Sequence, residues 1–154
     1  MTSPWPFAQW GIDLIGSLPK GRGAATHAIV AIDYFTKWVE VGVLSQIMER
    51  KTTDFIWKNI ICRYGIPYTI ITDNGRQFDN NNFREFCQNL GVDVKFCTPA
   101  HPQANGQVEA ANKVIKKLLK TRLGEKKGAW VDKLLGVLWA YRTTHKTATG
   151  ECLL

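Results

Sequence analysis

Three carboxylates spread along the chain are its residues best suited to chemistry. Asp13 lies inside the strand-like run WGIDLIG, and Asp73 lies where the apolar run YTIITDNG breaks. Thirty-five residues separate Asp73 from Glu109, which sits early in an expected helix within HPQANGQVEAANK. Mg²⁺ prefers oxygen ligands, and two such ions about 3.5–4 Å apart can activate an attacking hydroxyl and stabilise the leaving oxygen of a displacement. If the three carboxylates meet, they predict a two-metal site for phosphoryl transfer.

Taken singly, each of these carboxylates has an ordinary structural explanation. An Asp-Asn-Gly sequence after a strand is commonly a turn, and a Glu near a helix N-terminus is favoured by the helix dipole. Asp33, in a second expected strand, competes with Asp13 for the site, and Glu40 and Asp79 are lesser competitors. Side-chain chemistry alone does not rank Asp13 above Asp33.

Cations follow Glu109 along one face of its expected helix. At about 100° per residue, Lys113, Lys116 and Lys120 fall within about 40° of Glu109, and Asn112 falls about 60° away. The apolar residues gather on the opposite side: Ala111, Val114, Ile115 and Leu118. A lone acid at the head of a basic row favours contact with a DNA backbone on either side of the reacting phosphate, although a solvated helix face is the alternative.

The overall charge agrees with a polyanionic partner. The 154 residues include twenty Lys and Arg against thirteen Asp and Glu, a net charge of +7. Residues 113–127 alone carry seven cations and one acid, which is the balance expected of a nucleic-acid-binding segment. The four cysteines and three histidines are scattered, so no zinc site is expected. The cysteine pattern favours free, mostly buried thiols in a reducing compartment.

No membrane or secretory segment is expected. No apolar stretch approaches the roughly 20 residues that span a bilayer, and the start MTSPWPFAQW lacks the features of a secretory signal. A soluble intracellular protein is therefore expected.

Hydrophobic periodicity predicts an α/β fold with a mixed five-stranded sheet flanked by helices. Strands are expected at residues 10–15, 27–34, 37–44, 68–72 and 92–97. Helices are expected at 49–64, around 83–90, at 107–123 and at 129–144. A short Phe-Thr connection makes the second and third strands an antiparallel hairpin. Residues 1–9 read as a tail and residues 10–154 as one domain, in which strand ends meet loops and a helix start at the site.

Five segments together resemble the integrase catalytic core of gypsy-like LTR retrotransposons, particularly those of plants. They are WGIDLIGSLPKG, DYFTKWVE, ITDNGRQFDNNNF, HPQANGQVEAANKVIKKLL and LWAYRTTHKTATGE. The resemblance covers nearly the whole chain, and the Asp, Asp, thirty-five residues, Glu spacing is highly specific.

The resemblance implies a ribonuclease-H-like fold, two Mg²⁺ or Mn²⁺ ions, and 3′ processing of element DNA ends followed by strand transfer into chromosomal DNA. Its catalytic and metal-binding triad falls on Asp13, Asp73 and Glu109, which decides between Asp13 and Asp33. The HPQANGQ loop, with Asn105, is similar to the mobile loop beside the site. Positions facing DNA fall on Asn112, Lys113 and Lys116, and Lys120 extends the same row. A homodimer or higher oligomer acting in the nucleus is expected.

The chain departs from the family pattern at several points. Ser17 stands where the family usually has Pro, and the flanking zinc and C-terminal DNA-binding modules are not found. Cys152-Leu153-Leu154 replaces the usual Thr-Pro-Phe continuation, so a shortened final helix is expected. Trp130, Leu134, Leu138 and Trp139 form an apolar helix stripe that either packs in the core or contributes to a homodimer contact.

Two other functions compete with integration. A ribonuclease H acting on RNA–DNA hybrids would share the fold, but that family places an extra catalytic Glu on its first helix, where Glu49 lies only at the beginning, and lacks the thirty-five-residue spacing. A non-catalytic DNA-binding protein derived from a degraded element would keep the fold as a relic. The intact triad argues against decay.

Overall fold

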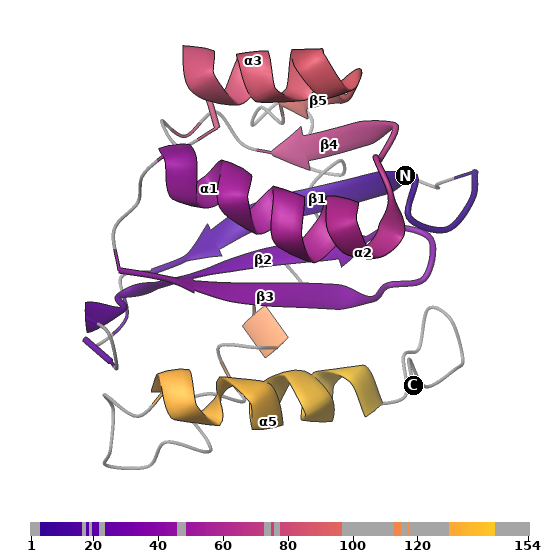
Figure 1. Cartoon of the computed structure of the whole chain (residues 1–154). Helices are drawn as coiled ribbons and strands as arrows, with labels where there is room; N and C mark the ends of the chain where they lie inside the picture. Colours follow the sequence, from indigo (N-terminus) through magenta and orange to yellow (C-terminus); the bar gives the residue numbers. More distant parts are fainter. Residues whose placement is uncertain are drawn as a thin grey trace.

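The structure is a computed structural model of the chain (Figure 1). It describes residues 4–16, 18, 20–21, 24–45, 49–72, 75, 78–96, 113–114, 117 and 130–143.

The centre of the fold is a mixed five-stranded sheet. Its strands are β1 (Gln9–Ile15), β2 (His27–Asp33), β3 (Val39–Leu44), β4 (Thr69–Thr72) and β5 (Asp93–Phe96). They lie in the order β3-β2-β1-β4-β5. The pairs β1/β2 and β2/β3 are antiparallel, whereas β1/β4 and β4/β5 are parallel. The predicted mixed sheet and the antiparallel hairpin are confirmed.

The β2–β3 connection is longer than the Phe-Thr link predicted from sequence. β2 ends at Asp33 and β3 begins at Val39. The Asp33 carboxylate accepts hydrogen bonds from the backbone and hydroxyl of Thr36, at 2.9 and 2.6 Å, which holds the intervening residues in a turn. Lys37 in this turn has a φ of 65°, a conformation incompatible with the predicted strand start at residue 37.

One continuous helical stretch follows the hairpin. It consists of α1 (Glu49–Ile56), a π-helical segment η2 (Trp57–Ile61) and α2 (Cys62–Tyr64). It ends at Gly65, whose φ of 94° suits glycine. The span 49–64 agrees with the prediction, and Cys62 and Arg63 within it are exposed. Cys62 lies about 160° around the helix from the buried Ile60 at ordinary helical rotation.

Two further helices complete the described elements. In α3 (Asn81–Leu90), the Asn80 side chain accepts a hydrogen bond from the Phe83 backbone at 2.7 Å and so caps the start. Gly91, with a φ of 72°, ends this helix as predicted. The last helix is α5 (Trp130–Thr143). No helix in the described part of the chain is long and apolar enough to cross a membrane.

The helices pack on opposite faces of the sheet, with α1 and α3 on one side and α5 on the other (Figure 1). A hydrophobic cluster lies on each face of the sheet, and successive side chains of β1 project alternately towards one cluster and the other. Trp10 and Ile12 pack with the α1 and α3 residues, and Ile15 packs with α5. Asp13 therefore belongs to the α5 side of the sheet, because it alternates with Ile12 and shares its parity with Ile15.

The apolar stripe of α5 is confirmed as core packing, with one correction. Trp130, Leu134 and Leu138 are buried against the sheet. Trp139, predicted to belong to the stripe, is 62% exposed, because it lies about 100° around the helix from Leu138. Val137 and Tyr141 complete the buried face instead.

Candidate active site

Asp13 lies on the central strand of the sheet. It pairs across the antiparallel ladder with Val30 of β2. Its side chain is partly buried, and its Oδ1 accepts a hydrogen bond from the Leu14 backbone N–H at 2.8 Å. A residue paired within a central strand of a sheet has a well-fixed Cα position, as a metal ligand requires.

On its other side, β1 pairs in parallel with β4. The register joins Gln9 to Thr69, Trp10 to Ile70 and Gly11 to Ile71. β4 ends at Thr72, one residue before Asp73 in the sequence. Asp73 and Glu109 both lie outside the described residues, so of the predicted triad the structure places Asp13 alone.

Asp33, the main competitor of Asp13, has a structural role. Its side chain is fully buried. Oδ1 accepts from the backbone N–H of Phe7 at 3.0 Å, and Oδ2 accepts from the Thr36 backbone and hydroxyl. The carboxylate thus ties the segment before β1 to the turn after β2. Donors from the protein itself surround both of its oxygens, which leaves this group poorly suited to bind a substrate or a metal.

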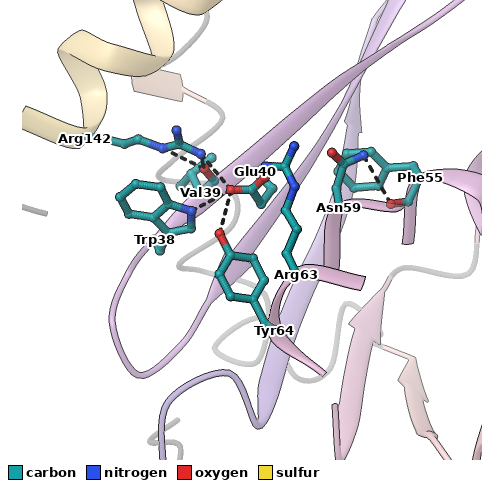
Figure 2. Close-up of polar contacts among 8 residues, drawn as sticks. All are labelled: Trp38, Val39, Glu40, Phe55, Asn59, Arg63, Tyr64 and Arg142. Atoms are coloured by element: carbon teal, nitrogen blue, oxygen red, sulfur yellow. Dashed lines mark hydrogen bonds and ion pairs between the residues drawn. The ribbon is translucent and has the colours of Figure 1, made fainter. Parts of the chain in front are cut away.

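Glu40, a lesser competitor, is also occupied by the protein (Figure 2). Oε2 accepts from Trp38 Nε1 at 2.6 Å and from the Tyr64 hydroxyl at 3.0 Å. Two guanidinium groups complete the cluster, with Arg63 at 2.5 Å and Arg142 at 2.8 Å. Burial raises the pKa of Tyr64, and the neighbouring Glu40 charge raises it further. Sequence reasoning missed this cluster, although the lone acid in the strand-like run KWVEVGVL was its signal.

The third competitor, Asp79, lies on the surface just before α3. It forms an ion pair with Arg84, which lies within that helix. Each competing carboxylate is therefore explained by a contact within the fold. These contacts give Asp33 a structural role, and the assignment of Asp13 as a catalytic residue stays a prediction.

The predicted DNA-binding residues are described only in part. Lys113 and Val114 are helical, as is Lys117, and all three are exposed. Val114, which belongs to the expected apolar side of this helix, is 40% exposed. Neither hydrophobic cluster of the described residues includes it. Asn105, Asn112, Lys116 and Lys120 lie outside the described residues.

Among the residues that the structure describes, the cysteines and the other metal-ligand side chains form no second site. Cys87 is buried and Cys62 is exposed, while Cys97 and Cys152 lie outside the described residues, so the expectation of mostly buried thiols stays a prediction. Within the described ranges, no group of three His, Cys, Asp or Glu side chains could hold a metal ion. The predicted metal site has two of its three ligands outside those ranges.

Comparison with known proteins shows the family to which the chain belongs. The family model of the integrase core domain matches residues 4–102. The Gag-Pol polyprotein of walleye dermal sarcoma virus is 32% identical over 142 residues, 92% of this chain and 8% of that polyprotein. The Pro-Pol polyprotein of simian foamy virus type 3 is 31% identical over 94% of this chain and 12% of its own length. The Transposon Tf2-3 polyprotein of Schizosaccharomyces pombe is 28% identical over 94% of this chain and 11% of its own length.

Solved structures share the fold. A simian T-cell lymphotropic virus intasome, in complex with PP2A regulatory subunit B56 gamma, matches with a TM-score of 0.84 at 20% identity, covering 99% of this chain and 55% of that one. The HTLV-2 integrase catalytic core domain in complex with magnesium matches with a TM-score of 0.76 at 23% identity, covering 97% and 95%. The sheet and its helices are thus those of the ribonuclease-H-like integrase core. The chain spans about a tenth of the length of the polyproteins it matches, and it belongs to the integrase core domain family.

Proposed function

We propose that this chain is the catalytic core of a gypsy-like retrotransposon integrase. In this proposal Asp13, Asp73 and Glu109 bind two Mg²⁺ or Mn²⁺ ions. The site processes the 3′ ends of element DNA and transfers them into target DNA. The narrower assignment to gypsy-like elements, particularly of plants, is supported by the sequence motifs, and the retroviral and Tf2 relatives agree with the broader family.

The parallel pairing of β1 with β4 is the observation that carries the proposal. The first three residues of β1 each pair with the residue sixty positions later in β4, from Gln9 and Thr69 to Gly11 and Ile71. Continued by two residues, this register would place Asp73 beside Asp13. Paired residues on adjacent strands lie about 4.8 Å apart and project from the same face. Two carboxylates in that relationship would face one metal site on the α5 side of the sheet.

The chemistry of the donor set fits a hard divalent cation. Asp13, Asp73 and Glu109 all offer carboxylate oxygens, the ligand type that Mg²⁺ and Mn²⁺ prefer. Asp13 is partly rather than fully buried, so its carboxylate is within reach of an ion at the sheet surface. When bound, two such ions would supply activation of the attacking oxygen and stabilisation of the leaving oxygen. The chain's own residues would fix the position of the site and the path of the DNA.

Cations beside Glu109 would hold the DNA. Lys113 is helical and exposed, as a phosphate-binding residue must be. We include Lys116, Lys120, Asn112 and Asn105 in the same DNA-binding surface, because the expected helix and loop place them near Glu109. The net charge of +7 supports a DNA partner. A homodimer or higher oligomer acting in the nucleus completes the proposal, and other segments of a longer protein would contribute to joining two DNA ends.

Metal-dependent thermal stability tests the proposed site. Clustered carboxylates repel one another until cations neutralise them, so Mn²⁺ should raise the melting temperature by binding the folded state. Asp13→Asn and Asp73→Asn should each abolish most of this rise. Asp79→Asn is the matched control, because Asp79 is an exposed carboxylate paired with Arg84, and it should leave the rise unchanged. A wild-type melting temperature that stays constant under saturating Mn²⁺ would refute the metal site and favour a non-catalytic DNA-binding protein.

A further inference from the structure

Lys95 projects from the edge strand β5 onto the face of the sheet that carries Asp13. Its neighbours Val94 and Phe96 pack against the core on the α1 and α3 side. Lys95 is exposed. Because successive side chains of a strand alternate between faces, Lys95 projects from the opposite face, the one shared by Asp13 and Ile15.

The strand register gives the distance between the two residues. Lys95 pairs with Ile71 of β4, and Ile71 pairs with Gly11 of β1. Asp13 lies two residues further along β1. The separation is therefore two strand spacings, about 10 Å, across the sheet and about 7 Å along it, or about 12 Å between the two Cα atoms. That span corresponds to a few nucleotides of a DNA strand, since phosphates follow one another at about 3.4 Å of helix axis on each strand.

The sheet around Lys95 is not covered by α5. The core beneath α5 includes residues of β1, β2 and β3 together with Ile71 of β4, and within the described residues it includes none of β5. Figure 1 shows α5 beside β3, with β5 at the opposite edge of the sheet. A large ligand that reached Asp13 across the β4 and β5 side would pass over Lys95.

Lys95 has no structural partner within the described part of the chain, where it takes part in no ion pair or side-chain hydrogen bond. Asp93, two residues earlier, is the other exposed residue of β5. A lysine on an edge strand can also serve only to prevent unwanted strand pairing. The two roles can be distinguished by replacing the lysine. If it only protects the edge, the salt dependence of DNA affinity stays the same, whereas loss of a DNA-binding lysine changes it.

We propose that Lys95 binds a backbone phosphate of the DNA strand that enters the Asp13 site, a few nucleotides from the reacting phosphodiester. This inference rests on the proposed function and adds a contact on the sheet edge to the row that follows Glu109. The contact joins the lysine ammonium to a backbone phosphate. It therefore fixes the position of the DNA strand and does not depend on the base sequence.

Salt-dependent DNA binding tests the inference. Affinity of the full chain for an element-end duplex is measured across a range of salt concentrations for wild type, Lys95→Gln and Lys95→Arg. Lys95→Gln should reduce the slope of log affinity against log salt by about 1, and Lys95→Arg should restore it. The matched control is Lys58→Gln, because Lys58 is exposed in η2 on the other side of the sheet, and its slope should equal that of wild type.

Single neutral methylphosphonate substitutions then locate the contact. One substitution, a few nucleotides from the cleaved bond, should weaken binding of wild type and leave binding of Lys95→Gln unchanged. An unchanged salt slope in Lys95→Gln, with an unchanged melting temperature, would overturn the inference and leave Lys95 an edge-protecting residue. Absence of salt-dependent DNA binding by wild type would instead refute the proposed function itself.

Discussion

The Arg142 guanidinium lies 2.8 Å from Oε2 of Glu40 and joins the last turn of α5 to the edge strand β3 (Figure 2). The same guanidinium donates from Nε to the Val39 carbonyl at 3.1 Å and lies 3.8 Å above the Trp38 ring. Glu40 is also paired with Arg63, which comes from the helical stretch on the other face. One buried carboxylate therefore connects the two helical layers around the edge of the sheet.

Loss of Arg142 should cost more stability than loss of Arg63. The Arg142 side chain is 17% exposed and that of Arg63 is 55% exposed, although both are paired with Glu40. Arg142→Met should lower the free energy of unfolding by about 3 kcal/mol, as expected when one member of a buried pair is removed. Arg63→Met should lower it by about 1 kcal/mol or less. Urea unfolding of both variants measures the difference, and equal losses would contradict this account of the cluster.

The two strand aspartates should respond differently to the same substitution. The two Asp33 oxygens accept hydrogen bonds from Phe7 and Thr36. Asp33→Asn replaces one of these acceptors with an NH₂ donor, so it should destabilise the fold by about 1–3 kcal/mol. Asp13→Asn keeps an oxygen near the Leu14 N–H and should leave the metal-free stability nearly unchanged, while removing activity. Chemical unfolding in the absence of metal provides the comparison. A stable Asp33→Asn variant would show that the turn does not depend on its carboxylate.

The buried Cys87 should make the protein less stable in alkali. Burial raises the pKa of its thiol to about 12, from an ordinary value of 9.0. The unfolded chain therefore ionises Cys87 before the folded chain does, and stability that is complete below about pH 9 is lost as the pH rises towards 12. The contribution is at most about 1.4 kcal/mol per pH unit.

Unfolding free energies at pH 8, 9 and 10 measure this loss. Cys87→Ala should show a flatter decline than wild type, even though it is less stable at every pH. Cys62→Ala, at an exposed position, is the matched control and should follow wild type. Identical slopes for Cys87→Ala and wild type would show that burial of this thiol does not govern the alkaline decline.

The basic row after Glu109 should contribute phosphate contacts one by one. Lys113→Ala and Lys116→Ala should each weaken DNA binding about equally across sequences and reduce the salt slope by about 1. Lys126→Ala, in the segment expected between two helices, should have a smaller effect. Salt titrations of affinity give the slopes, and wild-type slopes in the first two variants would mean that the row is only a solvated face.

Most of the fold was predictable because local signals and tertiary contacts agree. Gly65 and Gly91 end helices where the sequence indicated, and the near-continuous apolar run of β2 is buried on both faces. The π-helical segment η2 was not predictable, since its residues have ordinary helical periodicity. The turn after Asp33, which the hydrogen bonds from Thr36 hold, was also missed, and the bond from Phe7 to the same carboxylate joins residues 26 positions apart in sequence.

The candidate site was predictable to a different degree. Family resemblance alone selected Asp13, whereas the structural roles of Asp33 and Glu40 depend on tertiary hydrogen bonds. Lys95 was missed because charge on a short edge strand carries no periodic signal. Its distance from Asp13 can be deduced only from the pairing of β1, β4 and β5.

Reversal of a preformed strand-transfer junction tests the central claim most directly, because it requires the metal-bound triad and no joining of two ends. The chain should release the element end in the presence of Mg²⁺ or Mn²⁺ and should fail without metal. Glu109→Gln and Asp13→Asn should reduce the rate to background, whereas Asp79→Asn should retain it. Reversal at the wild-type rate in Glu109→Gln would contradict the assignment of Asp13, Asp73 and Glu109 as the catalytic site.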